Sequence, residues 1–233
     1  MKTKKTIGIL GGMGPEASAN LYKKTIKYAQ YQYGAIQDYD YPPMIIYSMP
    51  LEGFDETGIA DPKLVKKQLV DGVKKLESAG CDLIIMVCNT VHVFYEEIQK
   101  VVKIPILNIV EETLKCVKKD RYKKVGLFTS QSTTESHLYQ RKFEKKGVKV
   151  IEPSKEQQKV LNQVIETVMG GKQGDADIIA LKEVAQLFVK DGAEAIVMGC
   201  TEIPLAINQT NTDIKLFDTI EIIVKSAVDY SVK

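Results

Sequence analysis

The chain has 233 residues, of which 44% are hydrophobic and 27% are charged, and its formal net charge is +2. This length fits one large or two small domains, and the hydrophobic fraction is sufficient for buried cores. The near-neutral charge disfavours binding to nucleic acids or membrane surfaces. The chain has only two arginines, Arg121 and Arg141, which further disfavours recognition of phosphate groups because bidentate recognition of phosphate prefers arginine.

The sequence also indicates a compartment. No apolar run approaches the roughly 20 residues that span a bilayer, and the N-terminus lacks the apolar core of a signal peptide. We therefore expect a cytoplasmic protein whose four cysteines are reduced thiols. Their spacing includes no C-x-x-C pair, so a structural zinc site is not expected.

A glycine turn follows the first expected strand, residues 6–10. The turn reads Gly11-Gly12-Met13-Gly14-Pro15, and an amphipathic helix is expected from Glu16 to Tyr33. Pro15 suits the first turn of that helix, where its missing N–H costs nothing. The turn either brings backbone N–H groups close to an anionic ligand or is a tight structural turn only. Its match to the dinucleotide pattern is weak, because no acidic residue ends the second strand.

The remaining elements alternate as in an α/β protein. Strands are expected at 44–49, 83–87, 104–109, 124–128, 148–151, 194–198 and 216–217, and helices at 64–76, 111–119, 135–146, 155–169, 176–190 and a last one containing Ile222, Ile223, Ala227 and Val228. The loop 50–62 is either a lid over a binding site or an ordinary surface connection. The hydroxyl-rich turn 129–134 either holds a carboxylate or caps a helix, with Thr134 leading into that helix.

The sequence contains an internal duplication. Residues 78–90 read SAGCDLIIMVCNT and residues 190–202 read KDGAEAIVMGCTE, which places Cys88 on Cys200 with no gap. A short apolar run with turn signals at both ends is typical of a buried parallel strand. The pattern of 5–10 recurs at 123–128, and that of 102–112 recurs at 212–222, in the same order.

This duplication predicts an α/β fold of two pseudo-symmetric domains, each a parallel sheet flanked by helices. Each domain places one cysteine at the C-terminal end of an equivalent strand, the edge at which open α/β sheets bind ligands. We therefore expect an active site in a cleft between the domains, with one thiol on each wall.

Three interpretations of the cysteines are open. Burial in a core explains Cys81 and Cys116 well, but explains poorly the two cysteines that precede polar residues at strand ends. A redox pair is disfavoured by the compartment and the spacing. The third interpretation is an acid and a base on opposite faces of a substrate carbon, which together invert that carbon.

Oriented donors around the substrate carboxylate would stabilise the carbanion, and Asn89, Thr90 and Thr201 are placed to supply them. His92 either hydrogen bonds the thiol four residues before it or is a packed or capping residue.

Three motifs carry a resemblance to a known family. They are Gly11-Gly12-Met13-Gly14-Pro15-Glu16, Cys88-Asn89-Thr90-Val91-His92 and Gly199-Cys200-Thr201-Glu202-Ile203. The chain resembles the cofactor-independent aspartate/glutamate racemase family over nearly its whole length. Its glycine motif is similar to that of the aspartate racemase branch, since the Asp-Ser pair of glutamate racemases is absent.

The resemblance implies proton exchange at Cα by Cys88 and Cys200, with neither pyridoxal phosphate nor metal, in an enzyme that is usually a homodimer. It implies that the C-terminal strand and helix return to the first domain, so the first domain is expected to comprise residues 1–101 plus 211–233 and the second residues 102–210. The substrate contacts carried over by motif position are Met13, Asn89, Thr90, Thr201 and Glu202, with Thr133 as a weaker candidate.

The sequence departs from the family pattern in the residues that hold the substrate side chain. Some aspartate racemases hold the side-chain carboxylate with an arginine in the loop after the second strand, and residues 49–62 of this chain contain no arginine. Those racemases also have a lysine near the end of the long second-half helix. The corresponding position here is near Met169, and Lys172 is close to it. We therefore predict an aspartate racemase, with a racemase of glutamate or of another amino acid as an alternative. Two further alternatives are a diacid isomerase or decarboxylase that uses one thiol, and a non-catalytic regulator that binds its ligand at the glycine turn.

Overall fold

The computed structural model describes residues 4–55 and 57–233. These residues form two compact units. The first unit runs to Gly53 and adds Ala60–Ile109 and Ile220–Lys233, and the second comprises Phe54–Ile59 and Val110–Thr219. Each unit is an α/β structure with its own parallel sheet.

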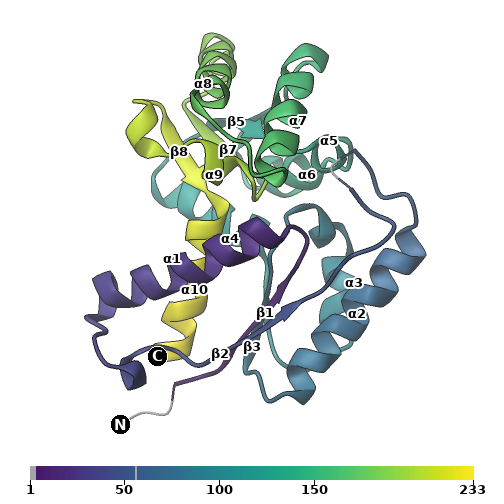
Figure 1. The fold of residues 1–233 in the computed structure, drawn as a ribbon. Coiled ribbons are helices and arrows are strands. Elements are labelled where there is room, and N and C mark those ends of the chain that lie inside the picture. Colours follow the sequence, from purple (N-terminus) through teal and green to yellow (C-terminus); the bar gives the residue numbers. More distant parts are fainter. Residues whose placement is uncertain (1–3, 56) are drawn as a thin grey trace. The chain divides into compact units, whose positions relative to one another are not determined.

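The first unit is built on four parallel strands in the order β2-β1-β3-β4, and Figure 1 labels β1, β2 and β3. The strands are β1 (Ile7–Gly11), β2 (Met44–Ser48), β3 (Leu83–Met86) and β4 (Ile106–Leu107). β1 and β3 are buried along their whole length, as expected for central strands covered on both faces. The helices α1 (Pro15–Tyr33) and α2 (Pro62–Ser78) pack on β1, and the short elements η1 (Asp38–Asp40), η2 (Thr90–Phe94) and α3 (Tyr95–Gln99) complete the connections.

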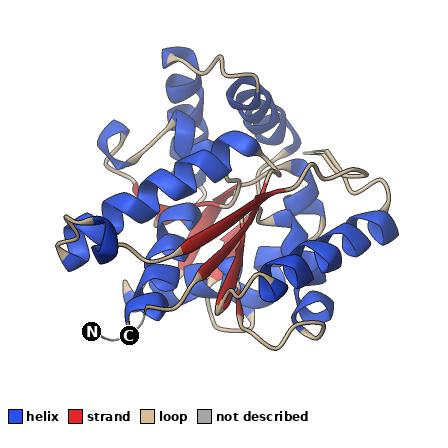
Figure 2. Ribbon diagram, turned by 60° about the horizontal axis from the view of Figure 1, so that its bottom comes forward, coloured by secondary structure: helices blue, strands red, loops and turns tan. Residues whose placement is uncertain are grey.

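The second unit repeats this arrangement, with strand order β6-β5-β7-β8. The strands are β5 (Lys124–Phe128), β6 (Lys149–Ile151), β7 (Ala195–Met198) and β8 (Lys215–Asp218). The helical elements are α4 (Ile109–Lys119), α5 (Gln131–Glu135), α6 (Leu138–Glu144), α7 (Lys155–Met169), α8 (Asp175–Lys190), α9 (Ile203–Ala206) and η3 (Gln209–Asn211). Figure 2 shows helices in blue packed against the strands in red. The core of this unit joins α7, α8 and the apolar residues of β7.

The structure confirms the predicted duplication in its details. The glycine that ends the helix before β3, Gly80, has φ 88°, and its counterpart Gly192 before β7 has φ 89°. Asp82 accepts a hydrogen bond of 2.7 Å from the Thr6 N–H, and its counterpart Glu194 accepts one of 2.6 Å from the Lys123 N–H. The same turn and the same carboxylate contact therefore align the central strand pair in both units.

The last helix of each half belongs to the other unit. The helix after β4 is α4, which belongs to the second unit from Val110 onward, and the helix after β8 is α10 (Thr219–Val232), which belongs to the first from Ile220 onward. The predicted domain boundaries after residues 101 and 210 fall before β4 and β8, and so assign each of these strands to the opposite domain. However, β4 is hydrogen bonded to β3 and β8 to β7, so each strand stays in the sheet of its own half. The expectation that the C-terminal strand returns to the first domain is therefore wrong, because only its helix does.

Other local differences have physical causes. The helix predicted at 135–146 is broken into α5 and α6 by His137, whose φ of 51° is left-handed and cannot continue an α-helix. The strand predicted at 104–109 contains two residues, Ile106–Leu107, because helix α4 already begins at Ile109. The residue that caps α5 is Ser130 rather than Thr134, since its side chain accepts a hydrogen bond from the Thr133 N–H.

Among the described residues, no helix combines the length and the apolar character needed to cross a membrane.

Candidate functional site

The glycine turn of the first unit lies at the carboxyl end of β1. Gly12 has φ 93°, and a Cβ there would lie 2.5 Å from the backbone nitrogen of Met49, so the position requires glycine. The Gly12 N–H donates to Ser18 Oγ at 3.0 Å, and Ser18 Oγ–H donates to the Gly14 carbonyl at 2.9 Å. Met13 is buried within this turn. Ser18, which the sequence did not single out, therefore holds the turn that positions Met13.

Cys88 follows β3, the strand next to β1. The Val87 N–H donates to the Leu10 carbonyl at 2.9 Å, so the chain is still held in the sheet immediately before the cysteine. Cys88 is 6% exposed, and Asn89 and Thr90, which follow it at the start of η2, are buried too. The structure thus brings Met13, Cys88, Asn89 and Thr90 to one sheet edge, as predicted.

His92 contacts the backbone of Cys88. Its Nδ1 lies 2.8 Å from the Cys88 carbonyl oxygen, and its Nε2 lies 3.4 Å from the Ile109 nitrogen. A carbonyl only accepts and an N–H only donates, so Nδ1 carries the hydrogen and Nε2 accepts. A ring with these two bonds is a neutral imidazole. It joins Cys88 to the first residue of α4, Ile109, which supports a structural role for this buried ring.

Cys200 occupies the equivalent position after β7 in the second unit. Its Sγ donates to Glu202 Oε2 at 3.2 Å, and Thr201 Oγ1 donates to the same oxygen at 2.8 Å. All three side chains are buried. The residue before the thiol is Gly199, where a Cβ would lie 2.7 Å from the Thr129 side chain, which explains why a glycine replaces the valine of the first unit here.

The hydroxyl-rich turn lies beside this thiol, because β5 and β7 are neighbours with Phe128 paired to Met198. Thr129 and Thr134 are joined by their hydroxyls at 2.8 Å, and Ser130 Oγ lies 3.1 Å from Thr133 Oγ1. Gln158 of α7 donates to the Thr129 carbonyl at 2.9 Å. The turn is therefore a helix cap with an internal hydroxyl network, and Thr133 lies buried within it.

The loop after β2 contributes a segment to the second unit. Within Phe54–Ile59, the Asp55 carboxylate accepts hydrogen bonds from the Thr57 hydroxyl at 2.7 Å and from the Gly58 N–H at 3.0 Å. These bonds hold the pKa of Asp55 below its ordinary value. The Asp55 carbonyl accepts from Ser132 Oγ of α5 at 3.0 Å. The predicted loop thus includes a turn closed by hydrogen bonds to Asp55, and this turn is hydrogen bonded to the hydroxyl-rich turn. No sequence signal indicated this attachment.

The other two cysteines differ from the pair at the strand ends. Cys81 lies at the amino end of β3, and burial, with Asp82 as a smaller contribution, raises the pKa of its thiol. Its sulfur lies within 3 Å of the point where a Cβ on Gly8 would be, so it fills the space that this glycine leaves. Cys81 is therefore a core residue as predicted, whereas Cys116 is only partly buried.

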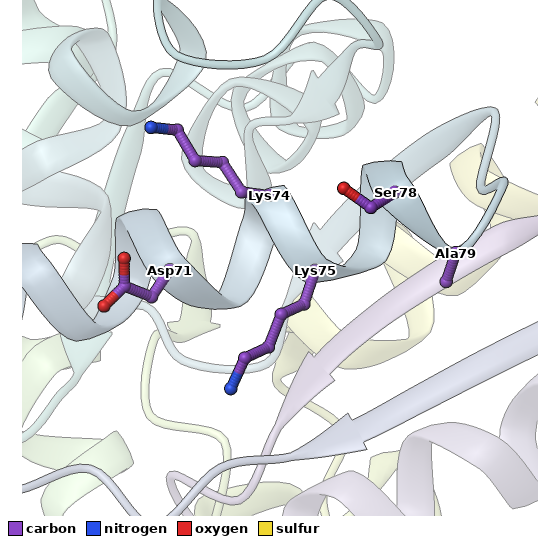
Figure 3. Close-up of a pocket in the computed structure, with 5 residues that line it drawn as sticks. All are labelled: Asp71, Lys74, Lys75, Ser78 and Ala79. Carbon is purple, nitrogen blue, oxygen red and sulfur yellow. The ribbon is translucent and has the colours of Figure 1, made fainter.

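A hollow elsewhere on the first unit contains none of the predicted site residues. It is lined by Asp71, Lys74, Lys75 and Ser78 of α2 and by Ala79, all shown in Figure 3. Lys75 Nζ donates to Tyr47 Oη at 2.9 Å and lies over the Tyr47 ring. The hollow is a surface feature of one helix, and the candidate site remains at the thiol edges.

A comparison with protein families identifies the family of this chain. The model of the Asp/Glu/hydantoin racemase family matches residues 10–227. The chain belongs to this family. The match includes both cysteine motifs and the glycine turn, and it agrees with the predicted resemblance.

Individual relatives agree with this assignment. The chain is 38% identical to the broad-specificity amino-acid racemase RacX of Bacillus subtilis over 95% of this chain and 96% of the relative. The crystal structure of an aspartate racemase homologue from Pyrococcus horikoshii matches with a TM-score of 0.81 and 31% identity, covering 98% of this chain and 100% of that chain. The aspartate racemase of Picrophilus torridus matches with a TM-score of 0.82 and 26% identity, covering 98% and 95%. These similarities show an isomerase of the amino-acid racemase type.

Proposed function

We propose that the protein interconverts the L and D forms of a free amino acid by proton exchange at Cα between Cys88 and Cys200. One observation carries the proposal: the two thiols end equivalent strands, β3 and β7, of a duplicated α/β unit. Core cysteines do not account for this placement, because each thiol is followed by polar residues at a ligand-binding sheet edge.

The reaction needs one group on each face of the substrate carbon. A thiolate on one side removes the Cα proton and becomes a thiol, and the thiol on the other side delivers its proton to the carbanion and becomes a thiolate. The carbon is inverted, no electrons are exchanged, and the number of protons is conserved. Each direction uses the two cysteines in opposite roles.

The neighbouring side chains supply the binding functions. Asn89 and Thr90 follow one thiol and Thr201 follows the other, and their amide and hydroxyl groups are our candidates for holding the substrate carboxylate. The Thr201 hydroxyl donates to Glu202 in this structure and would turn from it to the substrate. Such donors stabilise the charge that moves onto the carboxylate as the Cα proton leaves. Met13 contributes apolar surface at the glycine turn, and Thr133 is a further candidate contact.

The resemblance makes aspartate the first substrate to test, and the charge distribution favours an alternative. The segments that join each strand end to the next helix contain neither arginine nor lysine, whereas they contain Glu52, Asp55, Glu56, Asp61, Glu152 and Glu202. A second carboxylate on the substrate would need a compensating cation if it were buried. These segments therefore favour an amino acid whose side chain is neutral or basic.

The test follows both the stereochemistry and the exchange of the Cα proton. Purified protein is incubated in deuterated water with each enantiomer of aspartate, glutamate, alanine and lysine, and products are resolved by chiral chromatography and mass spectrometry. We expect inversion accompanied by deuterium at Cα for at least one pair. Cys88→Ala and Cys200→Ala should each reduce the rate by at least about 100-fold, which is the usual size of an acid–base contribution.

Cys116→Ala provides the matched control, because this partly buried thiol lies on α4, outside both motifs of the sequence. It should retain wild-type activity. The proposal fails if no amino acid is inverted or exchanged, or if either motif variant remains fully active. A homodimer, which the resemblance implies, is checked by light scattering on the same samples.

A further inference from the structure

The two thiols do not have the same neighbours. In the gapless alignment of the two motifs, Glu202 corresponds to Thr90, so a carboxylate in the second unit replaces a hydroxyl in the first. The difference is realised in the contacts of the second unit, where Cys200 Sγ donates to Glu202 Oε2 at 3.2 Å. This asymmetry is superimposed on a backbone that is otherwise repeated.

The Glu202 carboxyl group is in direct contact with the Cys200 thiol. Its Oε2 accepts from two donors, the Cys200 thiol and the Thr201 hydroxyl at 2.8 Å. A carboxylate accepts both bonds and needs no proton of its own, so we take Glu202 to be ionised, a premise that the Glu202→Gln variant below tests. Glu202 is 6% exposed, and within such a buried environment its charge acts strongly on a sulfur in contact with it.

Electrostatics then determines which form of Cys200 is favoured. A carboxylate accepts a hydrogen bond from a thiol, but it repels a thiolate at the same distance. Cys200 also packs in an apolar cluster that includes Ile203 and Ala206 of α9. Two further titratable groups that the structure places at this end of the sheet are Asp218, paired with Met198 at the end of β8, and Tyr139, which borders Gly199. Neither is a cation, so neither favours the thiolate.

We propose that Glu202 is a positioning residue that keeps the resting proton on Cys200, so that the free protein holds Cys88 as the base and Cys200 as the acid. This inference rests on the proposed racemase function and specifies its starting state. The first proton moves from the substrate to Cys88, and the Cys200 proton moves to the carbanion. Afterwards Cys88 carries the proton, and the thiolate of Cys200 stands beside a carboxylate. Return to the resting state requires Cys88 to lose a proton to solvent and Cys200 to regain one.

The experiment measures the two thiols directly, without substrate. Native protein is treated with iodoacetamide between pH 6 and pH 10, and the modification rate of each cysteine is followed by peptide mass spectrometry. Rates are normalised to the plateau of the same cysteine, which removes differences in access; the exposures are in any case similar, 6% for Cys88 and 8% for Cys200. We expect the Cys200 midpoint to lie at least about one pH unit above that of Cys88, a tenfold difference in thiolate fraction.

Glu202→Gln removes the charge and keeps an acceptor for the thiol. It should move the Cys200 profile about one unit to lower pH, and so raise its modification about tenfold at neutral pH, while the Cys88 profile stays in place. Glu202→Thr, which copies the residue of the first unit, should have the same effect. Glu183→Gln on the exposed face of α8 is the matched control and should change neither profile.

Equal midpoints in the wild type overturn the inference, and so does a Cys200 profile that both variants leave unchanged. The wild-type comparison needs no variant, so the inference stays testable if a variant fails to fold. Because the labelling needs no substrate, the thiol asymmetry is measured even if no amino acid is racemised. Failure of the inference and failure of the proposed function are therefore observed separately.

Discussion

At the scale of single residues, His92 shows how a histidine beside a catalytic candidate acts through the backbone. Its two ring nitrogens contact the Cys88 carbonyl and the Ile109 N–H. The pair of bonds fixes the ring in the Nδ1–H tautomer and connects the thiol segment to the first residue of α4. The alternative that the ring activates the thiol is therefore not needed to explain why a buried histidine stands at this position.

A substitution of His92 tests that role. His92→Phe retains a ring of similar size but leaves a buried carbonyl and a buried N–H without these partners, which costs about 1–3 kcal/mol each in the free energy of unfolding. We expect a corresponding fall in stability, measured by urea unfolding. Any racemase activity that remains should keep the wild-type pH profile, because His92 donates no proton to the substrate. A shifted profile with unchanged stability would instead indicate an acid–base role.

At the scale of elements, the glycine turn between β1 and α1 depends on a close backbone approach. Gly12 combines φ 93° with the nearby backbone of Met49, and Gly11 lies against Ser18, where a Cβ would be 2.5 Å from the hydroxyl oxygen. The turn also forms the link between the first strand and the Met13 side chain. Its geometry therefore couples folding of the sheet edge to formation of the candidate site.

Gly12→Ala is expected to destabilise the protein strongly. Its left-handed backbone disfavours any Cβ by about 1–2 kcal/mol, and displacement of the Met49 backbone adds to that cost. Gly174→Ala is the matched control, because a Cβ there meets open space and its φ is −157°. Thermal melting should show a drop of at least about 2 °C for Gly12→Ala, given about 1 kcal/mol or more, and little change for the control. Equal melting temperatures would contradict the steric argument.

The elements also show what the sequence could predict. The cysteine strands were predictable because apolar runs, glycines and the Asp82 and Glu194 carboxylates recur in both halves. The break at His137 was not, since a non-glycine residue in a left-handed conformation carries no local signal. The attachment of Asp55 to Ser132 was equally hidden, because it depends on a contact between residues 77 positions apart. Periodicity captures local structure, while these features depend on tertiary contacts.

At the scale of the whole molecule, the chain passes between the two units at Gly53, Ile59, Ile109 and Thr219. The last two passages follow β4 and β8 directly, and the first two lie in the loop after β2. The C-terminal helix α10 is joined to the first unit by specific bonds. Tyr28 and Tyr33 of α1 both donate to Asp229 Oδ1, at 2.9 and 2.8 Å, and Ser231 Oγ donates to the Lys5 carbonyl.

These tyrosine contacts make the stability of the first unit sensitive to alkaline pH. Burial, together with the Asp229 hydrogen bond, raises the pKa of Tyr33 to about 12 from its ordinary value of 10.0. The same causes raise the pKa of Tyr28 further. Below about pH 10 both phenols are protonated in the folded and the unfolded chain, so the contribution to stability is complete. Between pH 10 and 12 the unfolded chain loses these protons first, so the free energy of unfolding falls as pH rises.

The double variant Tyr28→Phe/Tyr33→Phe removes both titrating groups and should flatten this decline. Each phenol contributes at most about 1.4 kcal/mol per pH unit, and Tyr33 contributes less because it is 42% exposed and solvent screens its charge. Urea unfolding at pH 9, 10 and 11 measures the slope. Tyr31→Phe is the matched control, because this side chain is 87% exposed and its substitution should leave the wild-type slope. Parallel slopes for all three proteins would mean that the contacts of α10 with α1 do not control alkaline stability.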